Sequence, residues 1–205
     1  MPELYLRQSP LAHLHLDARA AGDVAMTDAG VMLRERRFLS MFNLRGEASK
    51  APFQAAVKKA VGIALPTTAN TAEGDPDGTR LLWLGPDEWL LVSVATNADI
   101  PSTLQKAASA MTEVGEARTV IRIGGVNARE VLAKGCSLDL HPRAFAPGQC
   151  AQTQLARAAV IIDHTQLDET TGSAEFDLYV LRSFAEYLWT WVEDAGQEYG
   201  VKVTA

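Results

Sequence analysis

The alternation of hydrophobic and polar positions is clearest in residues 118–142. Residues 119–123 are β-branched at every position except Arg122, which is typical of a strand. Asn127 is a favourable helix N-cap, and Glu130, three residues later, completes the pattern of a capping box. Gly135 then ends the helical pattern. We therefore predict a strand–turn–helix unit whose residues specify structure rather than a reaction.

The same reasoning predicts four elements before this unit. They are a strand at 37–45, a helix at 52–61 that begins with Pro52 and ends at Gly62, a hairpin at 80–94 and a helix at 101–111. A turn-rich loop at 66–78 separates the first helix from the hairpin.

After the unit, an apolar run at 158–162 lies within an extended segment at 152–165. A strand at 175–181 follows, and then a helix that begins at Ser183 with a second capping box completed by Glu186. Gly200 ends this helix, and 201–203 is expected to form a short edge strand. We predict that the core side of the last helix carries Phe184, Tyr187, Leu188, Trp191, Val192, Ala195 and Tyr199, which leaves Trp189 off that side.

The order β-α-β-β-α thus occurs twice, at about 37–111 and 118–200. It predicts an α+β fold of two halves, 37–115 and 116–205, with antiparallel or mixed sheets and forming one compact unit. Residues 1–36 are poorly periodic, and we interpret them as an extended N-terminal arm. A disordered terminus is the alternative; the leucines of this segment favour a docked arm.

Composition narrows the classes of function. The chain has 205 residues and a net charge of −6. This charge argues against nucleic acid or an anionic membrane as the main partner, because both require clustered lysine and arginine. The sequence shows neither a signal peptide nor an apolar run of 18 residues, and its two cysteines define no disulfide framework. We therefore expect a cytoplasmic protein.

No recognisable catalytic or ligand-binding motif is present. The turn GGVNA lacks the glycine spacing of a dinucleotide-binding loop, and there is no GxSxG elbow. Cys136, His141, Cys150 and His164 do not have the spacing of a zinc site. Carboxylates gather at 75–77, 87–88 and 163–169, in turn or loop positions where a solvent-exposed carboxylate is the ordinary expectation. Their separation in space does not follow from the sequence, so a catalytic acid/base pair among them is not excluded. We assign no catalytic, cofactor-binding or metal-binding residue.

An interface is the remaining candidate for a functional site. Trp and Arg are enriched at interfaces, and a leucine-bearing arm is suited to docking on a partner. The alternative to an interface is a tryptophan that is only partly covered by its own chain, together with arginines that are exposed to solvent. The predicted partner-contact residues are Leu11, Leu14, Leu16, Arg34, Arg36, Arg37 and Trp189.

Long segments of the chain resemble the gamma-subunit family of bacterial heterotetrameric sarcosine oxidases. These segments are RERRFLSMFNLRG, RLLWLGPDEWLLV, RTVIRIGGVNAREVLAKGCSLDLHPRAFAPGQCAQT and FDLYVLRSFAEYLWTWVEDAG. The resemblance implies a fold similar to the folate-dependent aminomethyltransferase type. It also implies alpha, beta and delta subunits as partners, mainly alpha, and no cofactor in this chain. In that family FAD, FMN, NAD, tetrahydrofolate and zinc belong to the other subunits.

The leading hypothesis is therefore a non-catalytic structural subunit. It would support the folate-side region of the alpha subunit while the complex demethylates sarcosine to glycine and passes the one-carbon unit to tetrahydrofolate. The chain is much shorter than a full aminomethyltransferase, and the family's folate-binding acid has no counterpart that we can place. A folate-binding, transferase-like module and an accessory assembly factor are the alternatives.

Overall fold

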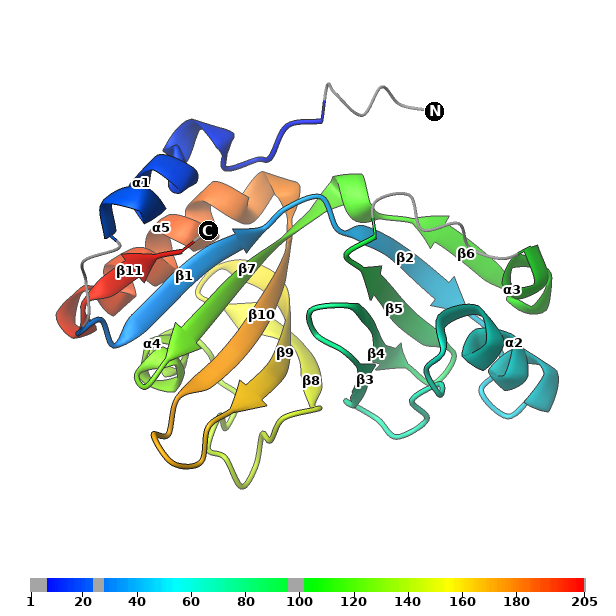
Figure 1. Ribbon diagram of the computed structural model, residues 1–205. Coiled ribbons are helices and arrows are strands. Elements are labelled where there is room, and N and C mark those ends of the chain that lie inside the picture. The colour runs from blue at the N-terminus through cyan, green and yellow to red at the C-terminus, as the bar shows by residue number, and fades with distance from the viewer. Residues whose placement is uncertain (1–6, 24–27, 96–101, 205) are drawn as a thin grey trace. The chain divides into compact units, whose positions relative to one another are not determined.

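The computed structural model describes residues 7–23, 28–95 and 102–204. The chain divides into two units, each with its own sheet (Figure 1). Unit 1 consists of Met1–Phe38, Ala117–Pro147 and Gln152–Ala205, and unit 2 of Leu39–Glu116 and Gly148–Ala151. This mixed architecture with two sheets is the α+β class that the sequence predicts.

Unit 2 is built on a five-stranded sheet with the order β3-β4-β5-β2-β6, in which every neighbouring pair is antiparallel. Its elements along the chain are β2 (Ser40–Arg45), α2 (Ala51–Val61), β3 (Ala72–Gly74), β4 (Thr79–Gly85), β5 (Glu88–Ser93), α3 (Ser102–Ala107) and β6 (Ala110–Glu113).

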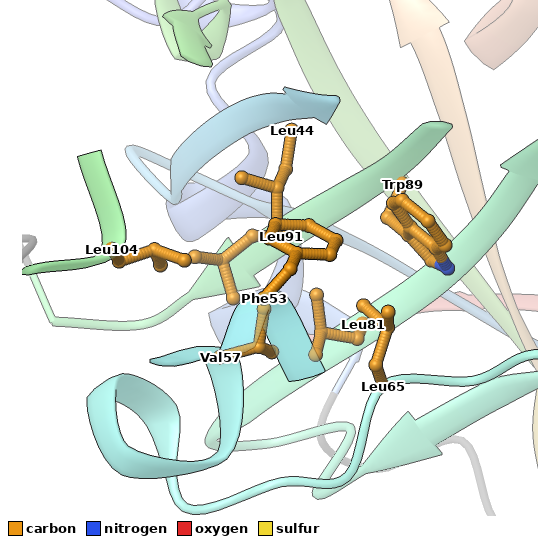
Figure 2. Close-up of a cluster of buried hydrophobic side chains, with 8 residues drawn as sticks. All are labelled: Leu44, Phe53, Val57, Leu65, Leu81, Trp89, Leu91 and Leu104. Carbon is orange, nitrogen blue, oxygen red and sulfur yellow. The ribbon is translucent and has the colours of Figure 1, made fainter. Parts of the chain in front are cut away.

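The core of unit 2 joins α2 to its sheet. Phe53 and Val57, one turn apart on α2, are buried, and the rings of Phe53 and Trp89 lie 5.6 Å apart. The Trp89 indole N–H donates to the Pro66 carbonyl at 2.8 Å, which satisfies the polar group of a fully buried ring. Figure 2 shows the whole cluster, which comprises Leu44, Phe53, Val57, Leu65, Leu81, Trp89, Leu91 and Leu104.

The predictions for this unit are confirmed for α2 and for the β4–β5 hairpin. Helix α2 has proline in its first turn and ends at Gly62 with a φ of +74°, a conformation that glycine adopts without strain. The predicted helix at 101–111 is wrong in its second half. There the chain forms β6, in which Met111 pairs with Leu44 of β2.

Unit 1 is built on a six-stranded sheet with the order β11-β1-β7-β10-β9-β8. Strand β11 is parallel to β1, whereas β1, β7, β10 and β9 are successively antiparallel. The elements are α1 (Leu16–Gly22), β1 (Val31–Arg36), β7 (Arg118–Gly125), α4 (Ala128–Ala133), β8 (Cys150–Leu155), β9 (Ala158–Leu167), β10 (Ala174–Leu181), α5 (Ala185–Gly196) and β11 (Val201–Val203).

The predicted repeat is present in an extended form. The order β2-α2-β3-β4-β5-α3-β6 in unit 2 corresponds to β7-α4-β8-β9-β10-α5-β11 in unit 1. The spatial order of the strands also corresponds, since β6-β2-β5-β4-β3 matches β11-β7-β10-β9-β8. The difference is β1, which lies between β11 and β7 in unit 1.

The extended arm predicted for residues 1–36 is therefore wrong where the structure describes this segment. Residues 31–36 form an interior strand, and Leu11 and Leu16 are buried within unit 1. The Ser9 hydroxyl donates to Glu35 of β1 at 2.7 Å, which fixes the preceding segment to the same sheet. Residues 1–6 and 24–27 lie outside the described part of the chain.

The two predicted capping boxes are also wrong. Neither Asn127 nor the start of α5 shows a side-chain cap. Instead, the Asn127 backbone N–H donates to the Gly30 carbonyl, and the Asn127 side chain packs against Gly30. A Cβ on Gly125, whose φ is +116°, would lie 2.3 Å from the Gly30 oxygen. The glycine turn after β7 is thus required by a close approach of two backbone segments.

In the described residues, no helix combines the length and the hydrophobicity needed to span a membrane.

Candidate functional site

The densest group of buried charges lies on one side of the unit 1 sheet. Arg34, Arg122, Asp177 and Asp163 occupy one row across β1, β7, β10 and β9, because Arg122 pairs with both Arg34 and Asp177, and Asp177 pairs with Asp163. Val31, on the opposite side of β1, lies near Gly196 of α5. The row therefore belongs to the side of the sheet that faces away from α5.

Two arginines enclose the carboxylate of Asp177. The Arg122 guanidinium binds it in the two-pronged geometry, with Nε donating to Oδ1 at 2.6 Å and Nη2 to Oδ2 at 2.9 Å. Arg36 donates to Oδ2 at 2.5 Å, and Arg122 also pairs with Glu175 at 3.0 Å. Asp177 is fully buried. We call Arg36, Arg122, Glu175 and Asp177 the arginine–aspartate cluster.

This arrangement connects strands rather than presenting a reactive group. Both oxygens of Asp177 already accept hydrogen bonds from arginine, so neither is poised to act as a general base or as a metal ligand. The four side chains are formally neutral in sum, two positive and two negative. The cluster joins β1, β7 and β10 through ionic hydrogen bonds, which are short and geometrically specific.

A second buried carboxylate lies on the helix side of the same strand β1. The Glu35 side chain is only 1% exposed and pairs with Arg37 at 3.1 Å. It also accepts hydrogen bonds from Ser9 and from Thr119, the latter at 2.9 Å. Arg37 in turn donates to Asp17 at 2.8 Å, and this hydrogen bond lowers the pKa of Asp17. These contacts bind the segment before β1 to the sheet.

His164 is the one histidine buried among the described residues. Its ring stacks on Phe176, with the centroids 4.5 Å apart, and Phe145 stacks 6.0 Å away. Burial and the nearby positive charge of Arg129 lower its pKa to about 4, although carbonyl groups such as that of Phe145 oppose the shift. The ring is therefore neutral at pH 7 and acts as part of the aromatic core.

The residues considered for metal binding do not come together. Cys150 donates to backbone carbonyls of Thr71 and Trp83, Cys136 lies near Thr153, and His164 lies in the aromatic stack. Within residues 7–23, 28–95 and 102–204, no group of three histidine, cysteine or carboxylate side chains could hold an ion.

The predicted partner-contact residues divide into two sets. Leu11, Leu16, Arg36 and Trp189 are buried inside unit 1, which removes them as partner-facing side chains. Trp189 faces inward, with its indole N–H donating to Glu193, which also pairs with Arg19 of α1. The second set, Leu14, Arg34 and Arg37, is half-buried, and its role at an interface stays a prediction.

Sequence reasoning did not single out Arg122, Glu175 or Asp177. The signal that could have revealed them is a charged residue between large apolar neighbours in a strand, as in VIRIG around Arg122 and EFDLYV around Asp177. Charges in such positions are rarely buried unless they are paired.

Comparisons with a family profile and with individual proteins point to the same family. The profile of the Sarcosine oxidase, gamma subunit family matches residues 45–198. The sarcosine oxidase subunit gamma of Corynebacterium sp. (strain U-96) is 34% identical over 98% of this chain and 95% of its own length. The corresponding subunit of Arthrobacter sp. is 32% identical, with the same coverage of each chain.

Two solved structures place the fold. A chain of the heterotetrameric sarcosine oxidase from Corynebacterium sp. U-96, in complex with pyrrole 2-carboxylate, matches with a TM-score of 0.80 and 35% identity, covering 95% of this chain and 96% of that one. The glycine cleavage system aminomethyltransferase T from Bartonella henselae matches with a TM-score of 0.66 and 16% identity, covering 97% of this chain and 59% of that one. The predicted aminomethyltransferase-like fold is confirmed.

Proposed function

The chain belongs to the sarcosine oxidase gamma subunit family, and from this membership we propose that it is a non-catalytic structural subunit of a heterotetrameric sarcosine oxidase. Its partners in this proposal are the alpha, beta and delta subunits, with alpha as the main contact. The flavins, NAD, tetrahydrofolate and zinc of the complex belong to those other subunits.

The observation that carries the non-catalytic role is the arginine–aspartate cluster. Its central carboxylate, Asp177, is fully buried and accepts hydrogen bonds from Arg36 and Arg122 of the same chain. Catalytic carboxylates need a lone pair or a proton directed at a substrate. Asp177 directs its hydrogen-bonding capacity to the arginines of neighbouring strands instead, which supports a scaffold.

The proposal that the chain supports the folate side of the alpha subunit rests on its fold. The fold is similar to that of an aminomethyltransferase, which links the chain to proteins of one-carbon chemistry. At 16% identity no residue role is carried over from that enzyme. A scaffold of this kind is expected to be a permanent member of the complex, with an interface of about 2,000 Å² or more.

Co-expression with the alpha, beta and delta subunits, followed by native mass spectrometry, tests this proposal. We expect one copy of the chain in the mature complex, and a colourless chain when it is purified alone. Absence from the mature complex would indicate an assembly factor. Tight flavin binding by the isolated chain would contradict the non-catalytic role.

The fold match to aminomethyltransferase T also favours a second candidate, a folate-binding module. Calorimetry of the isolated chain with tetrahydrofolate distinguishes the two. Micromolar binding that folate analogues compete away would promote the second candidate, whereas the structural proposal expects no heat of binding.

A further inference from the structure

Helix α5 carries two opposed rows of side chains. One row is buried and consists of Ala185, Leu188, Trp189, Val192 and Gly196. The other row has the same three- and four-residue spacing but faces away from the core, because every member is exposed or half-exposed. We call it the outer stripe of α5, and it lines a groove of about 640 Å³. It consists of Ser183, in the 3-10 turn Arg182–Phe184 just before α5, and of Glu186, Tyr187, Thr190, Trp191 and Asp194 on the helix itself.

The outer stripe is aromatic where a surface helix is normally polar. Tyr187 is 39% exposed and meets the exposed Phe184 edge-on, with ring centroids 6.5 Å apart. Seven large hydrophobic side chains are exposed in the described chain. Three of them fall within seven residues: Tyr187 of the outer stripe, and Leu181 and Phe184 just before α5. Such local concentration of exposed apolar groups marks an interaction surface, whereas scattered single residues do not.

Both rings of the stripe are held in place before any partner binds. The Tyr187 hydroxyl accepts a hydrogen bond from the Arg157 backbone N–H at 3.3 Å. The Trp191 ring covers Gly135 so closely that a Cβ there would lie 2.6 Å from it. Rigid aromatic side chains are suited to binding because little conformational freedom remains to be lost.

The charges of the stripe are of one sign. Glu186 and Asp194 are its only ionisable acids, they lie on either side of the rings, and the stripe has no lysine or arginine. They are eight positions apart in the sequence, which corresponds to about 12 Å along the helix. The His13 ring nitrogen lies 3.3 Å from the Glu186 carboxylate. A partner's Lys or Arg can lay its aliphatic stem over the rings and pair with a carboxylate.

A second copy of this chain does not fit the stripe. If two stripes packed antiparallel about Thr190, Glu186 of one copy would lie opposite Asp194 of the other. If they packed in parallel, each acid would face its own counterpart. Like charges brought together in this way oppose association.

We propose that the outer stripe of α5 docks a segment of a larger subunit of the heterotetramer that presents lysine or arginine beside apolar side chains. The inference rests on the proposed structural function. It places the contact on the outer stripe, whereas the buried Trp189 takes no part.

The test uses the full chain and its co-expressed partner subunits. The double variant Glu186→Lys, Asp194→Lys and the single variant Tyr187→Ala are each compared with the wild type for the dissociation constant toward the complex that lacks this chain. Each change is expected to raise the dissociation constant at least about tenfold. For the wild type, added salt should weaken association, and Glu186→Gln, Asp194→Gln should reduce that salt dependence.

The matched control is Glu73→Lys, Glu169→Lys, which makes the same change in net charge at exposed acids outside α5. It should bind like the wild type, and thermal unfolding should show that all variants fold. If the wild type binds the complex that lacks this chain and the stripe variants bind it with the same affinity, the docking site is overturned. A wild type that binds none of the other subunits would overturn the proposed function itself. Wild-type dimers that the stripe variants abolish would assign the surface to self-association.

Discussion

At Asp177, nitrogen atoms of two arginines converge on one carboxylate that has no access to water. Taking these charges out of water is costly, so the cluster adds little net stability relative to an apolar core of the same volume. Its effect is directional: the arginine N–H groups donate to the carboxylate in one geometry and thereby fix how β1, β7 and β10 align. Removing one member leaves the other charges buried and uncompensated.

Asp177→Ala is therefore expected to lower the free energy of unfolding by about 3–5 kcal/mol. Denaturant titration followed by circular dichroism measures it, with Asp177→Asn as a milder variant if the alanine protein does not fold. The exposed Glu169→Ala is the control and should change stability by less than about 0.5 kcal/mol. A loss at Asp177 no larger than that of the control would show that the cluster is not buried as described.

His164 makes stability depend on pH. Its folded pKa of about 4 lies below the usual value of 6.5, so between these values the unfolded chain binds a proton that the folded chain does not. The stabilising contribution is complete above pH 6.5 and is lost as the pH falls toward 4. At roughly 1.4 kcal/mol per pKa unit, the loss is on the order of 3 kcal/mol.

Unfolding free energies measured at pH 7.5, 6 and 5 check this expectation. The wild type should lose stability across the series, whereas His164→Gln, although less stable at pH 7.5, should show a flatter profile. Asp17, Asp168 and Glu198 also have lowered pKa values, but carboxyl groups ordinarily titrate below pH 5, the lowest pH of this series. Parallel profiles for the two proteins would contradict a neutral, buried His164.

At the scale of the element, β1 offers a matched pair of neighbours. Leu33 is fully buried, whereas Met32, on the opposite side of the strand, is 41% exposed. Leu33→Ala should cost about 2–5 kcal/mol of stability, and Met32→Ala less than about 1 kcal/mol. The same denaturant titration measures both. Two equally small losses would mean that residues 31–36 behave as an appended arm.

The sequence could not decide which side of α5 faces the core. Its helix is apolar on two sides, so the stripe through Tyr187 and Trp191 and the stripe through Leu188 and Trp189 both satisfy helical spacing. In the structure Trp189 is fully buried, and its indole N–H donates to Glu193. By contrast, α2 has one apolar side, a first-turn proline and a terminal glycine, and its prediction is confirmed.

The strands that the sequence missed share a different cause. Residues 110–113 alternate poorly and are mostly exposed, and they become β6 because β2 offers them a free edge. Residues 31–36 include three charged residues that weaken the apolar signal, yet Arg36 is buried because Asp177 lies in the same sheet. A pairing partner more than a hundred residues away is invisible to local pattern reading.

At the scale of the whole molecule, the shared order β-α-β-β-α of the two halves was predictable because it depends on local signals that recur in both. Glycine and proline end the elements, and the period of the apolar positions changes between strand and helix. The placement of β1 between β11 and β7 was not predictable, because it joins the start of the chain to its end through a parallel pairing. The arginine–aspartate cluster depends on this same non-local step, since Arg36 belongs to β1.

Amide hydrogen exchange of the whole chain tests this arrangement. Interior strands exchange only when the sheet opens, so β7, β10 and β9 should be the slowest elements of unit 1, with β1 close behind. The edge strand β11 and the three-residue edge strand β3 should exchange much faster. Mass spectrometry of peptides from a time course measures these rates. If β1 exchanged as fast as β11, the stable sheet would end at β7, and Arg36 could not be part of a permanently buried cluster.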